Sequence, residues 1–247
     1  MLENNLKLAK THDSCKNLNP RLTVILIHGI ASDSSTFNKF LECSEKLKSF
    51  REVRFVTFDL LGSGKSLKSD ELNYDYKDQL TALNNSIDEL NVTTPLILVG
   101  HSLGTFIATR YAKTYPKKVQ RLVLISPPIY TIEDLDNPAF IVAIKAFKDI
   151  IGAKDSRILQ TKSFNNSMEK IVLDRKNYQT LTEVKTPTEL IYGAKDQLIA
   201  SHNIPKLLKE NSIFIKATKT PGRHGVTQDK FNKIHAILKE VLNAETI

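Results

Sequence analysis

The sequence predicts a single α/β domain with a mostly parallel central sheet and helices on both faces. Short apolar segments rich in β-branched residues recur along the 247 residues and alternate with stretches of helical periodicity. Such continuous apolar segments are typical of strands that are buried on both faces. Their alternation with helices indicates crossover connections in one open sheet, and the chain length fits one such domain.

Six segments are expected to form the strands of this sheet. Each is short and mostly apolar, and each is bounded by polar or turn-forming residues. They are Leu22–Ile27, Val53–Phe58, Leu96–Val99, Leu122–Ile125, Glu189–Tyr192 and Ile213–Ile215. Before Leu22, only Leu6–Ala9 is a candidate for a further strand.

Helical periodicity separates these segments. Apolar residues recur at intervals of three or four, which places them on one face of a helix. The stripes are Phe37–Leu47, Leu80–Leu90, Phe106–Tyr111 and Phe231–Val241, the last with lysines on its other face.

One span is too long for a single crossover. It lies between Ser126 and Thr188 and has helical periodicity of its own, at Phe140, Ile144, Phe147 and Ile151. We expect an inserted helical cap over approximately residues 127–187. The whole chain, residues 1–247, is then one domain.

Composition and charge argue against several classes of protein. The net charge of +8 comes from basic residues that are spread along the chain and mixed with Asp and Glu, so no nucleic-acid partner is expected. No apolar segment approaches the roughly 18 residues that cross a bilayer, so we expect no stable membrane insertion. The N-terminus lacks the features of a signal peptide, and Cys15 and Cys43 make no disulfide framework. These observations predict a cytoplasmic protein.

The third expected strand ends in a motif that is typical of a nucleophilic serine. Gly100-His101-Ser102-Leu103-Gly104 has the pattern G-x-S-x-G between a predicted strand and a predicted helix. A serine there occupies a sharp, strained turn that lifts its hydroxyl above the sheet. Side chains at the two flanking positions would clash, so glycine is needed. The turn also presents backbone N–H groups at a helix N-terminus, where negative charge is favoured.

With this motif, the chain resembles the α/β-hydrolase superfamily from Leu22 to the C-terminal helix. The resemblance implies the α/β-hydrolase fold and three catalytic residues in the chain order Ser, acid, His. Asp196, in Gly193-Ala194-Lys195-Asp196, and His224, in Gly222-Arg223-His224-Gly225, match the positions of the acid and the base. Each follows a predicted strand. The resemblance also implies two backbone N–H donors for an oxyanion, at Ile30 and Leu103.

Other residues compete for two of these roles. Asp134 and Asp136 follow the fourth expected strand, where some members of the superfamily carry the acid. The remaining histidines compete with His224, although each has a structural interpretation; they are His12, His28, His101, His202 and His235. The fragment Gly62–Ser66 resembles the end of a phosphate-binding loop, but Asp59 stands where that motif needs its first glycine. We interpret it as a structural turn.

The resemblance implies a serine hydrolase that cleaves small to medium carboxylic esters through an acyl-enzyme. We expect a small-molecule substrate, no metal and no organic cofactor. Residues of the cap are expected to line the substrate pocket; they are Ile129, Tyr130, Phe140, Ile144 and Phe147. Two alternatives stay open: a carbon–carbon bond hydrolase or thioesterase with the same three catalytic residues, and a non-catalytic ligand receptor with the same fold.

Overall fold

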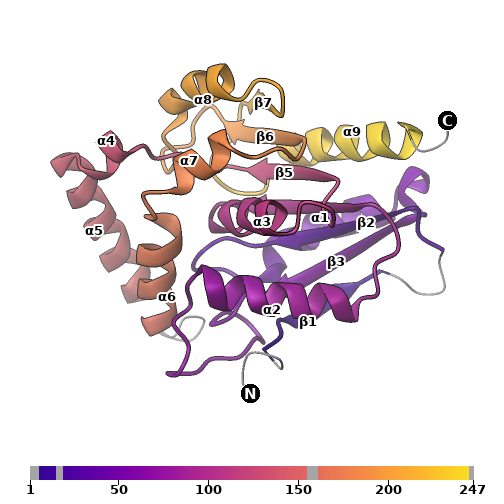
Figure 1. Ribbon diagram of the computed structural model, residues 1–247, viewed down its shortest axis with the longest axis horizontal. Helices are drawn as coiled ribbons and strands as arrows, with labels where there is room; N and C mark the ends of the chain where they lie inside the picture. Colours follow the sequence, from indigo (N-terminus) through magenta and orange to yellow (C-terminus); the bar gives the residue numbers. More distant parts are fainter. Residues whose placement is uncertain (1–5, 15–18, 155–160, 245–247) are drawn as a thin grey trace.

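A seven-stranded sheet forms the centre of the molecule, with strand order β1-β3-β2-β4-β5-β6-β7 (Figure 1). The computed structural model describes residues 6–14, 19–154 and 161–244. The strands are β1 (Ala9–Asp13), β2 (Leu22–Ile27), β3 (Val53–Asp59), β4 (Leu96–His101), β5 (Arg121–Ile125), β6 (Thr188–Gly193) and β7 (Ile215–Thr220). All neighbouring pairs are parallel except β1 and β3. The predicted fold class is therefore confirmed.

The strand predictions were least accurate at the two edges of the sheet. Strand β7 begins at Ile215, whereas Ile213 is 86% exposed. Only the first and last residues of this edge strand are buried, so it has no continuous apolar segment. At the other edge, Leu6 and Leu8 are not in strand β1. They are buried beside α2 (Tyr76–Glu89), where Ser86 Oγ accepts a hydrogen bond from the backbone N–H of Leu8.

Helices cover both faces of the sheet, because successive residues of each strand point to opposite sides. On one face, Ile25 and Ile27 pack in a cluster with apolar residues of α2 and α3 (Leu103–Thr114). On the other face, Val24 and Leu26 pack in a cluster with residues of α1 (Asn38–Glu45) and α9 (Gln228–Ala244). Helix α8 (Ile204–Glu210) adds Ile204 and Leu207 to the first cluster.

The connection from β5 to β6 is mostly helical and extends beyond one end of the sheet (Figure 1). Its elements are α4 (Ile132–Leu135), α5 (Pro138–Lys154), α6 (Thr161–Ser167), a π-helix (Met168–Val172) and α7 (Asn177–Thr182). A reciprocal capping box between Thr131 and Asp134 starts α4. Buried Met168 and Ile171 join the core beneath this connection. These helices occupy the span that the sequence analysis interprets as a cap.

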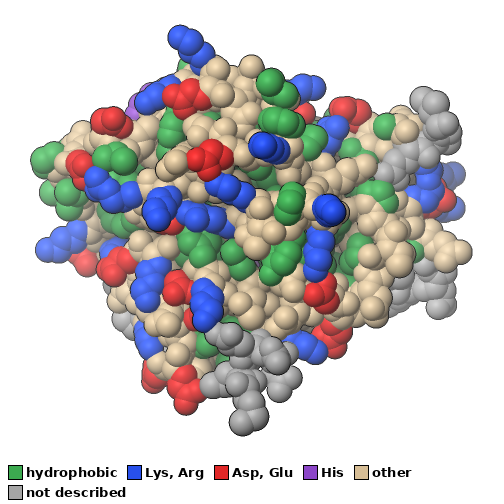
Figure 2. All heavy atoms as spheres, viewed as in Figure 1, with side chains coloured by type: hydrophobic (Ala, Val, Ile, Leu, Met, Phe, Trp, Pro, Cys, Tyr) green, Lys and Arg blue, Asp and Glu red, His purple; other side chains and the backbone are tan. Residues whose placement is uncertain are grey.

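The surface mixes charges of both signs. In Figure 2, basic and acidic side chains are interspersed with single apolar ones across the visible face. Within the described ranges, the helices are too short or too polar to cross a membrane.

Candidate active site

Ser102 occupies a strained turn between β4 and α3. Its backbone has φ 52° and ψ −117°, in a region that residues other than glycine rarely adopt. Such a conformation costs on the order of 1–3 kcal/mol and persists only where the surroundings enforce it. Here the N–H of Ser102 donates to the carbonyl of Ile125 at 2.9 Å, and the Thr105 hydroxyl donates to the carbonyl of Ser102 at 2.5 Å. Hydrogen bonds therefore hold both the N–H and the carbonyl group of the strained residue.

The two glycines of the motif are required by close backbone contacts. A Cβ on Gly100 would lie 2.4 Å from the carbonyl oxygen of Gly104. A Cβ on Gly104 would lie 2.3 Å from the carbonyl oxygen of Ile27, on the neighbouring strand. The helix therefore starts in direct contact with the sheet, and any larger residue would displace the turn.

Asp196 and His224 form a hydrogen-bonded pair. His224 Nδ1 lies 3.0 Å from each carboxylate oxygen of Asp196. The Asp196 side chain is 0% exposed and also accepts a bond from the N–H of Leu198 at 3.0 Å. Burial works to raise the pKa of Asp196, but the hydrogen bonds and the charge of His224 outweigh it, so the pKa lies below its usual value. The carboxylate is ionised at neutral pH.

Close contacts hold the acid segment against the base segment. A Cβ on Gly193 would lie 2.3 Å from the carbonyl oxygen of Gly222, two residues before His224. The N–H of Lys195 donates to that same carbonyl at 3.1 Å. The relative position of Asp196 and His224 therefore depends on backbone packing as well as on their own hydrogen bond.

A cavity of about 450 Å³ opens above Ser102 and is also lined by His101 and His224. The rest of its lining is mostly apolar and comes largely from the β5–β6 connection. Four of the residues expected in the pocket line it, namely Tyr130, Phe140, Ile144 and Phe147. Ile129 does not. Its side chain is 1% exposed and packs in the core, while its carbonyl accepts from Asn203.

Ser102 and His224 thus share one cavity, although no hydrogen bond joins their side chains within the described part of the chain. Catalytic hydrogen bonds are often long or poorly aligned before a substrate binds and tighten in the complex.

The loop after β2 packs directly against Ser102. A Cβ on Gly29 would lie 3.0 Å from Ser102 Cβ, and Ile30 lines the cavity. Buried His28 fixes this loop, because its Nε2 accepts from the N–H of Leu60 at 2.9 Å while Nδ1 lies 2.8 Å from the Gly29 carbonyl. These contacts assign the proton to Nδ1, and burial lowers the pKa of His28.

Comparisons with known proteins agree with this architecture. Residues 23–144 match the family model for the alpha/beta hydrolase fold. A monoacylglycerol lipase from Paleococcus ferrophilus superposes with a TM-score of 0.65 at 20% identity, covering 96% of this chain and 98% of that one. An esterase from Exiguobacterium antarcticum gives a TM-score of 0.69 at 18% identity, covering 94% of both chains.

This chain belongs to the α/β-hydrolase superfamily. Within it, a probable lysophospholipase from Arabidopsis thaliana, BODYGUARD 1, is 34% identical over 111 residues. That alignment covers 44% of this chain and 23% of the relative. The matched part is thus about a quarter of the plant protein.

The two other candidates for the acid in this hydrolase-fold chain, Asp134 and Asp136, have other partners. Asp134 lines the cavity, but its carboxylate caps α4 and binds Asn203 and His202. Asp136 forms an exposed ion pair with Arg175. Among the described residues, no hydrogen bond or ion pair joins either carboxylate to His224, so Asp196 is the carboxylate that the structure pairs with that histidine.

The other histidines also have partners of their own. His12 pairs with Glu45 at the surface, and His235 Nε2 is hydrogen-bonded to Ser44. His101 is buried, and its Nε2 donates to the carbonyl of His224 at 3.0 Å. Burial, followed by the charge of His224, lowers the pKa of His101 to about 3, so this ring stays neutral.

The turn that resembles a phosphate-binding loop is organised by Asp59. Its carboxylate accepts from the N–H groups of Ser34 and Lys65 at 2.9 and 2.8 Å. A Cβ on Gly64 would lie 2.1 Å from that carboxylate. The polar groups of the turn therefore bind the chain itself.

Sequence reasoning missed one residue beside the site. Lys230 belongs to the last helix, whose lysines are expected on the exposed face, but it is 0% exposed and lies next to the segment that carries His224. Its spacing could have revealed it, since it stands four residues before buried Ile234 on the apolar face.

Among the described residues, no cluster of three or more His, Cys, Asp or Glu side chains is arranged to hold a metal ion.

Proposed function

We propose that this protein is a serine hydrolase that cleaves small to medium carboxylic esters through an acyl-enzyme intermediate. Ser102 is the nucleophile, His224 the general base and Asp196 the acid that orients it. One observation carries the proposal: His224, which is paired with Asp196, lines the same cavity as a serine that is held at positive φ at the start of a helix. The lipase and esterase names of the structural relatives support it.

The reaction follows from the chemistry of these groups. In the complex, His224 Nε2 takes the Ser102 proton as Oγ attacks the ester carbonyl, and then returns it to the departing alcohol. Asp196 accepts a hydrogen bond from Nδ1–H of His224, which keeps the proton on Nδ1 and leaves Nε2 free to act as a base. Water then repeats the sequence on the acyl-enzyme and releases the carboxylic acid.

The tetrahedral oxyanion would be bound by the backbone N–H groups of Ile30 and Leu103. Leu103 is the first residue of α3, and the first N–H groups of a helix have no partner within the helix. Ile30 belongs to the loop that packs against Ser102. Each such donor contributes roughly 3 kcal/mol of transition-state stabilisation.

The cavity lining supports an apolar acyl group. Tyr130, Phe140, Ile144 and Phe147 present ring and alkyl surfaces rather than charges. Each methylene transferred from water to such surfaces contributes about 0.8 kcal/mol. Since about 1.36 kcal/mol is tenfold in rate, kcat/KM should rise about fourfold per added methylene until the cavity is filled.

The test is a series of p-nitrophenyl esters of increasing acyl length, with matched thioesters. We expect ester turnover that rises with acyl length and is abolished in Ser102→Ala and His224→Ala. A protein that cleaves thioesters but not esters would move the proposal to a thioesterase. A wild-type protein that cleaves neither and resists fluorophosphonates would refute it and favour a receptor.

A further inference from the structure

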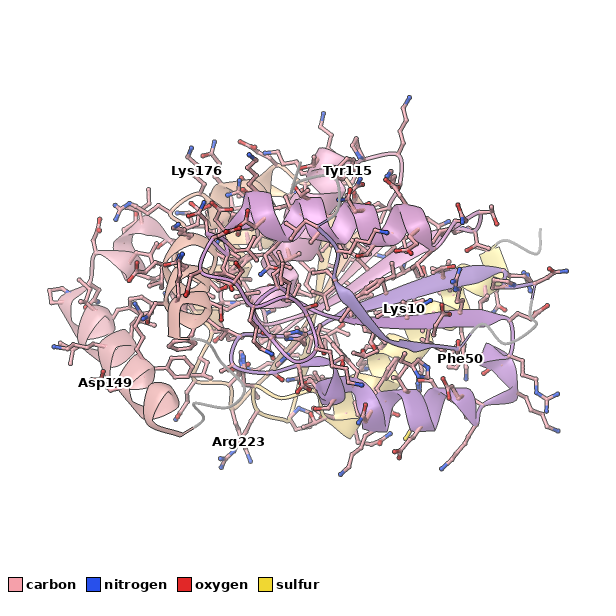
Figure 3. The ribbon with its side chains drawn as sticks, turned by 90° about the horizontal axis from the view of Figure 1, so that it is seen from below. Lys10, Phe50, Tyr115, Asp149, Lys176 and Arg223 are labelled. Atoms are coloured by element: carbon pink, nitrogen blue, oxygen red, sulfur yellow. The ribbon has the colours of Figure 1, made fainter. Side chains whose placement is uncertain are left out.

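A buried lysine lies against the segment that carries His224. Lys230 Nζ donates to the carbonyl oxygens of Arg223, His224 and Gly225 at 2.5, 3.1 and 2.7 Å. Ser126 Oγ lies 2.9 Å from the same nitrogen, so four acceptors share its three N–H groups. The Arg223 side chain, in contrast, points away from the molecule (Figure 3). The segment therefore turns its carbonyl groups inward around the ammonium.

Burying this ammonium has a cost that an apolar side chain at the same place would not have. Isolated charges are expensive to remove from water, and a replacement by packed apolar groups is often more stable. Burial lowers the pKa of Lys230, against the opposing charges of Asp196 and Asp229. In the part of the chain that the structure describes, no carboxylate forms a direct ion pair with it. A lysine here thus calls for a role beyond filling space.

Ser126 joins the lysine to the end of strand β5. It follows β5, has a φ of 50°, and is held by a bond from its N–H to the carbonyl of Ile191 at 2.8 Å. An ammonium can only donate hydrogen bonds, so Ser126 Oγ accepts from Lys230 and keeps its own proton to donate. The nearby Ser126 hydroxyl is also one of the groups that lower the pKa of Asp196.

We propose that Lys230 is a positioning residue for the histidine base, an inference that rests on the proposed function. Through three carbonyl groups it fixes the backbone around His224, and through Ser126 it holds that backbone against the end of strand β5. The segment that carries the base is therefore held by one buried cation. The carbonyl of His224 also accepts a hydrogen bond from His101 Nε2 at 3.0 Å.

The test compares Lys230→Met with Lys233→Met. Methionine keeps the length and apolar stem of lysine but donates no hydrogen bond. Lys233 lies on the same helix and is exposed, so it is the matched control. A misplacement of about 1 Å can cost roughly 100-fold in rate. We expect Lys230→Met to lower kcat about 10- to 100-fold with KM within about twofold, and Lys233→Met to leave both unchanged.

A second readout needs no catalysis. In protein with isotopically labelled histidine, the ring nitrogens of His224 report which one carries the proton, and His224→Gln assigns the signals. The wild type and Lys233→Met should show a single form protonated at Nδ1. Lys230→Met should show a mixture of the two neutral forms, which a purely structural role far from the ring would not produce.

Ser126→Ala keeps the test decisive if Lys230→Met does not fold. It removes one of the four acceptors of Lys230 and leaves the three carbonyl contacts, so we expect a smaller loss of kcat, about 3- to 10-fold, with KM unchanged. Unchanged kcat and an unchanged His224 proton position in the folded variants would overturn the role of Lys230, while wild-type ester turnover would leave the proposed function standing. If wild type cleaves no ester, the proposed function fails and the nitrogen signals still decide the positioning.

Discussion

Asp196→Asn removes the charge that orients His224 while keeping the size of the side chain. Asp196 accepts from the N–H of Leu198 and from His224 Nδ1, and both carboxylate oxygens lie 3.0 Å from that nitrogen. An amide has one acceptor oxygen. If Leu198 keeps it, the NH₂ group faces Nδ1, and the ring must carry its proton on Nε2. The base that Ser102 needs is then lost.

The expected loss of kcat is about 10⁴-fold, the size found when such an acid becomes an amide. At about 1.36 kcal/mol per factor of ten, this is about 5.4 kcal/mol of transition-state stabilisation. The assay is kcat on a p-nitrophenyl ester, with the fold checked by circular dichroism.

Asp134→Asn is the matched control. Asp134 lines the same cavity but caps α4 and contacts His202 instead of His224. We expect kcat within about twofold of wild type and a loss of about 1 kcal/mol in the free energy of unfolding, because the cap is weakened. Full activity in Asp196→Asn together with a loss in Asp134→Asn would refute the assignment of the acid.

Three further predictions concern packing, pH and substrate length. Gly193→Ala forces a Cβ to within 2.3 Å of the Gly222 carbonyl oxygen, so calorimetry should show a loss of about 1–3 kcal/mol in the free energy of unfolding, and kcat should fall. Gly225→Ala, with open space around its Cβ, should change neither quantity. His101 has its pKa lowered to about 3, so the unfolded chain binds one more proton than the fold between pH 6.5 and 3. The free energy of unfolding should therefore fall with falling pH in that window, by up to about 1.4 kcal/mol per pH unit for this group. Denaturant titrations at several pH values should give a weaker pH dependence of this free energy for His101→Asn than for wild type. An equal pH dependence would contradict the burial argument. Ile144→Trp fills part of the cavity and should shift the kcat/KM maximum toward shorter acyl chains, and an unmoved maximum would exclude this cavity as the acyl site.

The central strands could be predicted because a buried strand needs apolar side chains on both faces. Leu22–Ile27 is buried at every position, and its sequence is almost wholly apolar. The edge strand β7 could not be predicted in this way because solvent reaches most of it, and only Ile215 and Thr220 at its two ends are buried. Leu6 and Leu8 were wrongly predicted to lie in a strand because apolar residues are also buried outside strands. Their side chains are buried beside a helix, and the two residues do not pair with a neighbouring strand.

Ser102 could be predicted at a strand end from its motif, and the resemblance to the superfamily pointed to Asp196 and His224. All three follow strands of one parallel sheet, and such strands end at the same edge. The lining of the cavity could be anticipated only in part. An apolar residue such as Ile129 serves a core as well as a pocket, and its sequence does not distinguish the two. Lys230 was missed because a lysine is taken for a surface residue unless its acceptors are known, and those acceptors are backbone carbonyls that no side-chain pattern reveals.

The most direct test of the account is covalent labelling with a fluorophosphonate, followed by peptide mass spectrometry. The reagent requires an activated serine, so the account predicts one adduct, on Ser102, and no adduct in Ser102→Ala. His224→Ala should keep the fold and label far more slowly, because the hydroxyl would have lost its base. An adduct on another residue, or an unlabelled Ser102 in folded wild-type protein, would contradict the claim that Ser102 and His224 work together in this cavity.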